Sequence, residues 1–442
     1  MLFVNPLKRL VGNYKQGRKI GMYSACTANE LVIEACLERA KQAQSYVLIE
    51  ATANQVNQYG GYSGMTPSGF RDYVHTIAAR VGFPQKYIIL GGDHLGPLTF
   101  SHLPAAEAME EAKELIRQFA AAGFAKIHID TSMRLGDDDP NQKLATELIA
   151  QRGAVLAQTA EEAFARLKAE YDAAVAPVYV IGSEVPVPGG SQEQEDTVQV
   201  TTAADFAETV DAYHDAFAEA GLHDAWQRVI AVVVQPGVEF ADETIHPYNR
   251  EAAAELCRAL DAYPNLVFEG HSTDYQTPLH LRQMVEDGIV FLKVGPALTF
   301  GLREGLFALS MIESELLGPT SRPLANFPSA LEAEMLASPK DWQKHYHGDE
   351  HQLRLARKYS LSDRSRYYLP REPVKKAVEL LFANLEAGIP LGMLSQFMPM
   401  QYQKARSGEL ATSPRELVKD RVVNCIDEYL SATGILSWAK EG

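Results

Sequence analysis

The sequence predicts an α/β protein, a (β/α)8 TIM barrel of residues 1–300 with an α-helical C-terminal extension, residues 301–442, packed on the barrel. Short aliphatic runs, typical of buried parallel strands, alternate with segments whose apolar residues recur at helical spacing. Eight such runs lie between residues 19 and 297, which matches a barrel of roughly 250 residues plus insertions. A doubly wound open sheet is the alternative, and a count of eight rather than six favours the barrel.

The eight expected strands are rich in β-branched and aliphatic residues. In order, they are KIGMYSAC (19–26), YVLIEAT (46–52), YIILGGDH (87–94), KIHID (126–130), VYVIGSEV (178–185), RVIAVVVQP (228–236), LVFEGHST (266–273) and VFLKVGPA (290–297). Because helical segments separate them, they are expected to pair in parallel through βαβ units.

Helices are expected between these strands, for example over ANELVIEACLERAKQA (28–43) and AAEAMEEAKELIRQFAAAGF (105–124). Another begins after Thr66, a good N-cap, with Pro67 at its first position, and ends before Gly82. From about residue 300 the pattern is helical only, with no convincing further strand. The stretch PTSRPLANFP (319–328) is expected to link two parts of this extension.

Composition excludes several classes of function. The chain has 442 residues, 46% hydrophobic and 22% charged, as in an ordinary globular protein. Its 41 basic and 57 acidic residues give a net charge of -16, which argues against nucleic acid or an anionic membrane surface as a partner. No apolar run is long enough to span a membrane, and the four cysteines are scattered. These features predict a cytoplasmic protein.

Polar residues close almost every expected strand. They are Ser24, Glu50, Asp93, His94, His128, Asp130, Glu184, Gln235, Glu269, His271 and Lys293. In a (β/α)8 barrel these positions form one mouth, where active sites are found. His128 and Asp130, two residues apart, share a face of their strand, as do Glu269 and His271. Any one of these groups could belong to a structural ion pair that fills the barrel, but the whole set favours a site.

Two histidines with several carboxylates offer nitrogen and oxygen donors that suit Zn²⁺, Mn²⁺ or a similar divalent ion. Such an ion would polarise a sugar carbonyl, while a carboxylate moves the proton. The glycine-rich stretches 59–67 and 186–190 are expected to form loops over the mouth. No ligand spacing here is as specific as H-E-x-x-H, so the metal is inferred from the barrel.

The absence of certain motifs argues against several classes of enzyme. The chain contains no Gly-Lys dipeptide, so it has no Walker A loop, and it lacks G-x-G-x-x-G and G-x-S-x-G. P-loop kinases, Rossmann dehydrogenases and α/β-hydrolases are therefore disfavoured. Candidates for binding a phosphate group are Lys293, Arg303, and Arg364 with Arg366 in SLSDRSRYY (360–368).

Several long motifs resemble one known family. They are IEATANQVNQYGGYSGMTP, ILGGDHLGP, VIGSEVPVPGG, VVVQPGVEF, HSTDYQT, LKVGPALTF and YSLSDRSRYY. Together they resemble the so-called non-catalytic subunit of class II D-tagatose-bisphosphate aldolase, a family that also carries the name tagatose-6-phosphate kinase. The resemblance covers nearly the whole chain and implies a (β/α)8 barrel with a role in the catabolism of galactitol, N-acetylgalactosamine or related ketoses. The kinase name fits poorly with the absence of a phosphate loop.

Two functions follow from the resemblance and stay open. In one, the chain is a metal-dependent 4-epimerase that interconverts D-tagatose 6-phosphate and D-fructose 6-phosphate by retro-aldol cleavage, as some relatives are understood to do. In the other, it is a structural partner that stabilises a separate catalytic aldolase subunit. The polar strand ends favour the enzyme. The sequence leaves open the identity of the metal, the choice between free and phosphorylated ketose, and the oligomeric state, a homo-oligomer included.

The family name supplies no catalytic residues, so the site is assigned from the strand ends. Glu50 and Asp130 are the expected proton carriers. The expected metal ligands are Asp93, His94, Glu184 and His271. The expected substrate-binding residues are Ser24, His128, Gln235, Lys293 and Arg364, of which Lys293 and Arg364 would face a phosphate group.

Overall fold

A computed structural model of the chain describes residues 4–183, 198–318 and 320–436. Eight parallel strands form a closed barrel in the order β1-β10-β9-β6-β5-β4-β3-β2. Their bounds are β1 Met22–Cys26, β2 Val47–Thr52, β3 Ile88–Leu95, β4 Lys126–Ile129, β5 Val178–Ile181, β6 Val229–Val234, β9 Val267–Gly270 and β10 Ile289–Val294. Each lies inside a run expected to be a strand or extends one residue past it, so the TIM barrel is confirmed.

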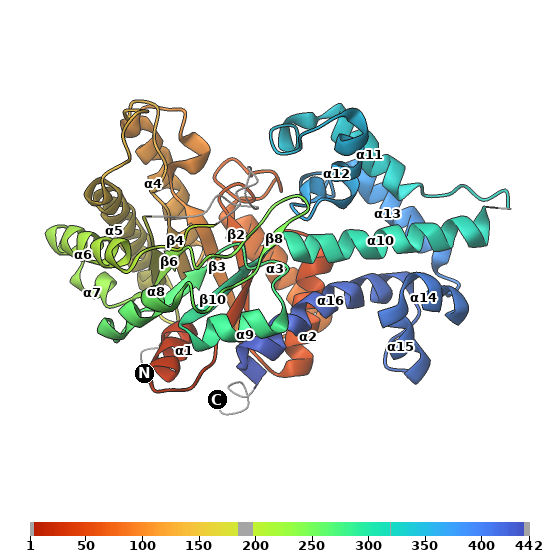
Figure 1. Cartoon of the computed structure of the whole chain (residues 1–442), viewed down its shortest axis with the longest axis horizontal. Coiled ribbons are helices and arrows are strands. Elements are labelled where there is room, and N and C mark those ends of the chain that lie inside the picture. The colour runs from red at the N-terminus through yellow and green to blue at the C-terminus, as the bar shows by residue number, and fades with distance from the viewer. Residues whose placement is uncertain (1–3, 184–197, 319, 437–442) are drawn as a thin grey trace.

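Helices surround the barrel, as the βαβ pattern predicts (Figure 1). They are α2 Glu30–Ala43, α3 Pro67–Val81, α4 Ala105–Ala121, α5 Thr146–Glu170, α6 Ala203–Glu219, α7 His223–Trp226, α8 Ala254–Ala259 and α9 Pro278–Glu286. Helix α3 begins as its sequence predicts, because the Thr66 side chain accepts a hydrogen bond from the N–H of Gly69. It ends at Gly82, whose φ of 67° is left-handed.

One helix and a two-stranded ribbon were not expected from the sequence. Helix α1 (Pro6–Lys15) lies below the barrel, where the Asn5 side chain donates to the backbone oxygens of Ala125 and Ala176, just before β4 and β5. The strands β7 (Glu239–Phe240) and β8 (Ile245–His246) pair as a short antiparallel ribbon. Both lie outside the eight-strand repeat, so barrel periodicity does not predict them.

The C-terminal extension is helical throughout, and no strand follows β10 in the ranges that the structure describes. Its helices are α10 Pro296–Leu317, α11 Phe327–Ala337, α12 Glu350–Tyr359, α13 Glu372–Leu385, α14 Leu391–Phe397, α15 Pro399–Ser407 and α16 Pro414–Thr433. Figure 1 shows this extension to one side of the barrel, with α10 and α16 running next to each other. The predicted domain boundary at residue 300 thus lies inside α10.

Helix α16 joins the extension to the barrel. It packs against α2, α9 and β1. Glu34 of α2 accepts from Lys419 Nζ at 3.0 Å and also pairs with Arg415, both on α16. Burial alone would raise the pKa of Glu34, but the hydrogen bonds from Arg415 and Lys419 lower it to about 2. The carboxylate is therefore ionised at neutral pH and ties the extension to the barrel wall.

Among the described helices, none combines the length and the apolar character that crossing a bilayer requires.

Candidate functional site

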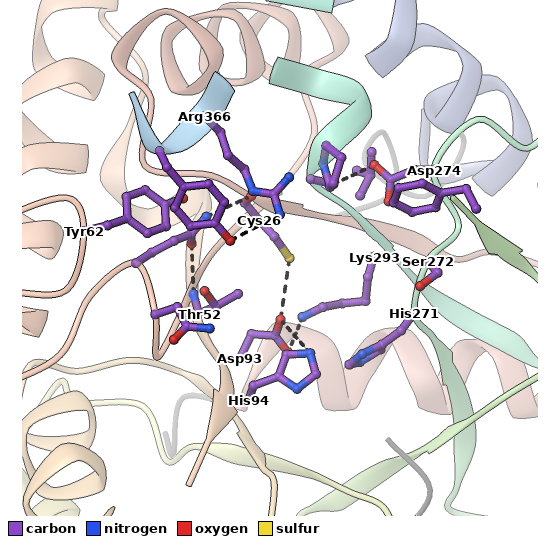
Figure 2. Close-up of a pocket in the computed structure, with 17 residues that line it drawn as sticks. Cys26, Thr52, Tyr62, Asp93, His94, His271, Ser272, Asp274, Lys293 and Arg366 are labelled. Carbon is purple, nitrogen blue, oxygen red and sulfur yellow. Dashed lines mark hydrogen bonds and ion pairs between the residues drawn. The ribbon is translucent and has the colours of Figure 1, made fainter. Parts of the chain in front are cut away.

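The carboxyl ends of the barrel strands surround a cavity that is open to solvent. Figure 2 shows Asp93, His94, Lys293 and His271 on one side of this cavity and Arg366 on the opposite side. Four of the polar strand ends of the sequence, Asp93, His94, His271 and Lys293, thus meet around one space, the mouth where a (β/α)8 barrel carries its active site.

Glycines allow β3 to end in an acid and a histidine. A Cβ at Gly91 would lie 2.4 Å from Glu50 Oε1, and one at Gly96 only 1.7 Å from the backbone oxygen of Asp130. Only glycine lets the neighbouring groups approach this closely. Between them, His94 has a left-handed φ of 48°, a conformation that costs energy outside glycine. The turn places Asp93 and His94 together at the mouth.

A network of buried ion pairs lies beneath the cavity. Lys126 is fully buried, and its Nζ lies 2.7 Å from Glu50 Oε1 and 2.7 Å from Glu269 Oε2. Lys293 also pairs with Glu50, and its Nζ lies 2.7 Å from Asp93 Oδ1. Burial alone would lower the pKa of Lys293 and raise that of Asp93, but the opposite charges win and move both the other way. Lys293 and Asp93 are therefore both charged.

Histidines and carboxylates alternate above this network. His94 Nδ1 lies 2.8 Å from Asp130 Oδ2, and His271 Nε2 lies 3.1 Å from Glu269 Oε1. Burial disfavours the charged form of His94, but Asp93 and Asp130 overcome this effect and raise its pKa. Burial also opposes ionisation of Asp130, yet the bond to His94 lowers the pKa of Asp130 to about 2. For His271 burial prevails and lowers the pKa to about 3.

Four of these residues form a donor set that could hold a metal ion. One ligand atom each of Asp93, His128, Glu269 and His271 lies within 4.8 Å of the others. His128 Nδ1 lies 2.8 Å from Asp93 Oδ1 and 3.1 Å from the backbone N–H of His94, whereas its buried Nε2 has no hydrogen-bond partner among the described residues. In the tautomer that carries its proton on Nδ1, toward Asp93, the Nε2 lone pair is available to an ion, which is how a carboxylate commonly orients a metal-binding histidine. Nitrogen and oxygen donors of this kind fit a divalent ion such as Zn²⁺ or Mn²⁺.

The far side of the cavity is formed by different elements. Tyr62 comes from the loop after β2, and Arg366 and Tyr367 come from a short 3-10 turn of the extension, η5 (Arg364–Tyr367). The rings of Tyr62 and Tyr367 meet edge to face, with centroids 4.6 Å apart. Asp274 also lines the cavity, and burial raises the pKa of its carboxyl group to about 6. Residues of both the barrel and the extension therefore line the cavity.

The structure brings most of the residues assigned from sequence to this mouth. The ion-pair network, together with the histidines and carboxylates beside it, contains seven of them. They are Glu50, Asp93, His94, His128, Asp130, His271 and Lys293. His128, assigned to substrate, stands in the possible metal set, whereas His94, assigned to the metal, binds Asp130. Glu184, and the loop expected at 186–190, lie outside the described residues.

Three other assigned residues neither line the cavity nor belong to these clusters. Ser24 is fully buried and lies beside Lys293 in the β1–β10 register. The Gln235 side chain accepts two backbone N–H bonds, from Gly237 and Val238, and so shapes a turn. Arg364 donates to His345 Nδ1 at 3.0 Å instead of facing the space where a phosphate group was expected.

The sequence assignment missed several groups of the site. Lys126 precedes His128 by two residues, so strand parity could have placed it in the barrel. Cys26 closes β1, and its Sγ lies 3.7 Å from Glu50 Oε2. Arg366, a candidate for binding a phosphate group that was left out of the final assignment, stands two residues after Arg364. Its direction depends on the η5 turn, for which the sequence offers no periodic signal.

Comparison with known proteins adds a family. The family described as D-tagatose-1,6-bisphosphate aldolase subunit GatZ/KbaZ-like matches residues 7–434. A solved structure called a "probable tagatose 6 phosphate kinase", from Sinorhizobium meliloti 1021, is 43% identical and has a TM-score of 0.84, covering 93% of this chain and 100% of that one. The YdjI aldolase from Escherichia coli K12 is 12% identical over 85% of this chain and 97% of its own, with a TM-score of 0.39. Fructose-bisphosphate aldolase from Campylobacter jejuni is 14% identical over 87% and 94%, with a TM-score of 0.41. These two aldolases are too distant to carry an argument.

Proposed function

The chain belongs to the GatZ/KbaZ-like family of D-tagatose-1,6-bisphosphate aldolase subunits, and from this premise we propose that it is a subunit accompanying a separate catalytic chain of a class II aldolase. The family match carries this proposal, because it spans residues 7–434 and its description names a subunit. It also confirms the resemblance seen in the sequence motifs. A protein related to tagatose-bisphosphate aldolase is thereby established, and the subunit role is the more directly supported of the two functions left open.

The subunit role has a direct test. The catalytic aldolase chain is purified with and without this one, and cleavage of D-tagatose 1,6-bisphosphate is followed over hours at 37 °C. A stabilising partner should co-elute with the catalytic chain and prolong its activity. If the two chains separate and the lifetime of the activity is unchanged, the subunit role is wrong.

A second function is favoured by the mouth of the barrel. We propose that the chain alone is a metal-dependent 4-epimerase of a phosphorylated ketohexose, interconverting D-tagatose 6-phosphate and D-fructose 6-phosphate. One observation supports it, the donor set of Asp93, His128, Glu269 and His271 with the unpartnered Nε2 of His128. A scaffold that only stabilises another chain has no need for ionised groups gathered around a solvent-open cavity.

The chain's own residues suit retro-aldol chemistry. A divalent ion on the donor set would supply polarisation of the C2 carbonyl of the ketose. Removal of the C4 hydroxyl proton lets the C3–C4 bond break, with its electron pair moving toward C2. The aldehyde then turns and adds again through its other face. His94 lines the cavity with Asp130 bonded behind it, so this pair is placed to move the proton.

Glu50 has a different part in this proposal. Its carboxylate is shared between Lys126 and Lys293, so that each of its oxygens faces an ammonium group. We therefore assign Glu50 to balancing the two lysines, and Asp130 with His94 to the proton. Lys293, which lines the cavity beside Asp93, offers a positive charge where negative charge develops on the ketose.

One experiment separates the two functions. The chain is purified alone, stripped with a chelator, and supplied with Zn²⁺ or Mn²⁺ and D-tagatose 6-phosphate, while D-fructose 6-phosphate is measured. Metal-dependent conversion supports the epimerase. Absence of conversion with each ion, and with the free sugars, refutes it and leaves the subunit role.

A further inference from the structure

An arginine of the extension reaches into the cavity of the barrel. Arg366 lies in η5, between α12 and α13, yet it lines the same cavity as Asp93, His94 and Lys293. Figure 2 shows its guanidinium group directed into the cavity, across from those three residues. The two ends of the cavity thus differ in chemistry, with the acid and histidine cluster at one end and an arginine at the other.

The charge of Arg366 is not neutralised by an acid. Its Nη1 donates to the backbone oxygens of Ser362 at 2.9 Å and Asp363 at 3.0 Å, and Nη2 contacts the Tyr367 hydroxyl at 3.4 Å. In the described part of the chain, no carboxylate lies within 4.0 Å of this guanidinium group. These contacts use three of its five N–H donors. A half-buried arginine with donors to spare suits an anionic ligand.

A second arginine, Arg364, shares an aromatic neighbour with Arg366. The guanidinium carbon of Arg366 lies 4.8 Å from the centroid of the Tyr367 ring, and that of Arg364 lies 5.9 Å from the same ring. Burial alone would raise the pKa of the Tyr367 hydroxyl, but the charges of Arg366 and Arg364 lower it. Of these two arginines, only Arg366 lines the cavity.

The nearby N-terminus of α10 is already occupied. Asp274 Oδ1 accepts the N–H of Gly295 at 3.0 Å and that of Ala297 at 2.8 Å, and Pro296 has no N–H. This carboxylate takes the position that an anion would otherwise fill at a helix N-terminus. Arg366 is therefore the cationic group at this end of the cavity that keeps donors for an anionic ligand.

Buried hydrogen bonds hold the turn that carries Arg366 in place. Asp363 Oδ1 accepts from Arg303 Nε at 3.2 Å and from Ser365 Oγ at 2.7 Å. Arg303, only 2% exposed, lies on α10, the helix that follows the last barrel strand. Asp363 has a left-handed φ of 27°, which this pairing maintains. The position of Arg366 is thus fixed before any ligand arrives, which favours binding.

We propose that Arg366 binds the phosphate group of an open-chain ketose phosphate whose carbonyl end lies against His94 and Lys293. The assignment rests on the ketose-phosphate substrate of the proposed epimerase. A guanidinium group matches two phosphate oxygens through parallel N–H bonds, and the Tyr62 and Tyr367 rings form the wall beside it. The extension therefore completes the site, and selects phosphorylated over free ketoses.

The test is binding by the full-length chain, measured by isothermal titration with D-tagatose 6-phosphate, D-tagatose and inorganic phosphate. Arg366→Gln should weaken binding of D-tagatose 6-phosphate by about 10- to 100-fold, the effect of losing a charge-assisted hydrogen-bond pair. Binding of D-tagatose should change less than about 3-fold, because it makes no phosphate contact. Arg366→Lys, which keeps the charge but loses the fork, should lie between.

Arg371→Gln is the matched control. Arg371 also packs on a tyrosine of the extension, 4.4 Å from the Tyr368 ring centroid, but pairs with Glu334 and does not line the cavity. It should leave both affinities unchanged. Equal loss of both ketoses in Arg366→Gln, no loss of either, or equal binding of the two ketoses by the wild-type chain would each overturn the assignment. Phosphate-selective binding that depends on Arg366, without conversion to D-fructose 6-phosphate, would refute the epimerase while the assignment stands.

Discussion

Replacing Lys126 with methionine would test whether the charges under the mouth balance one another. Its ammonium group is fully buried and lies 2.7 Å from carboxylate oxygens of both Glu50 and Glu269. Methionine fills a similar volume without charge, so the main loss is electrostatic. Removing one partner of a buried ion pair usually costs about 3–5 kcal/mol, because the other charge stays buried.

The remaining partners set the expected size within that range. Glu50 keeps its pair with Lys293, and Glu269 keeps His271 Nε2 at 3.1 Å and Lys293 Nζ at 3.8 Å. We therefore expect Lys126→Met to lower the free energy of unfolding by about 3 kcal/mol, the low end of the range. Adding Glu269→Gln removes the excess negative charge and should restore at least about 1 kcal/mol, a coupling typical of groups in direct contact.

Urea unfolding followed by circular dichroism measures both changes. Lys113→Met is the control, because Lys113 pairs with Glu110 at 2.6 Å on the exposed face of α4, where such pairs contribute about 0.5 kcal/mol or less. If Lys126→Met lowers the free energy of unfolding by less than about 1 kcal/mol, or if the double variant recovers none of the loss, these buried charges do not stabilise one another.

Other variants test the contact between α2 and α16, the turn after β3, and the proposed path of the proton. Because the pKa of Glu34 is lowered to about 2, its contribution is complete above about pH 4.5 and is lost as the pH falls toward 2. Glu34→Gln should therefore lower the free energy of unfolding by about 2 kcal/mol at pH 7, in urea titrations, and by clearly less at pH 3. Gly96→Ala should cost more than about 3 kcal/mol or prevent folding, since its Cβ would lie 1.7 Å from the Asp130 carbonyl oxygen. Gly392→Ala in α14, where a Cβ meets no atom within 4 Å, should be neutral or stabilise by up to about 1 kcal/mol in the same titration. In the epimerase assay Asp130→Asn should lower kcat at least about 100-fold with KM little changed, and unchanged kcat would remove Asp130 and His94 from the proton path.

The barrel could be predicted because its signals are periodic. Eight aliphatic runs at regular intervals, and caps such as Thr66 and Gly82, each specify an element through local chemistry. Helix α1 and the β7–β8 ribbon follow no such repeat. Their places depend on single contacts, such as the Asn5 side chain bonding to Ala125 and Ala176.

The site could be predicted to the level of the mouth but not of each residue's role. Strand parity gathers Glu50, Asp93 and His128 in one place, whatever the details. Which nitrogen of which histidine stays free depends on χ angles and on the left-handed turn at His94, which no local pattern encodes. Arg364 was assigned in place of Arg366, also a candidate, for the same reason, since both stand in one short turn.

We propose above all that the mouth holds a divalent ion through Asp93, His128, Glu269 and His271. Metal binding by the chelator-stripped, full-length chain tests this most directly. Zn²⁺ or Mn²⁺ is titrated into the wild-type chain, into His128→Ala, and into His214→Ala, a change of an exposed histidine on α6 that serves as control. We expect the wild-type chain to bind one ion saturably. His214→Ala should keep this binding and His128→Ala should lose it. No binding by the wild-type chain, or equal binding by His128→Ala, would contradict this proposal.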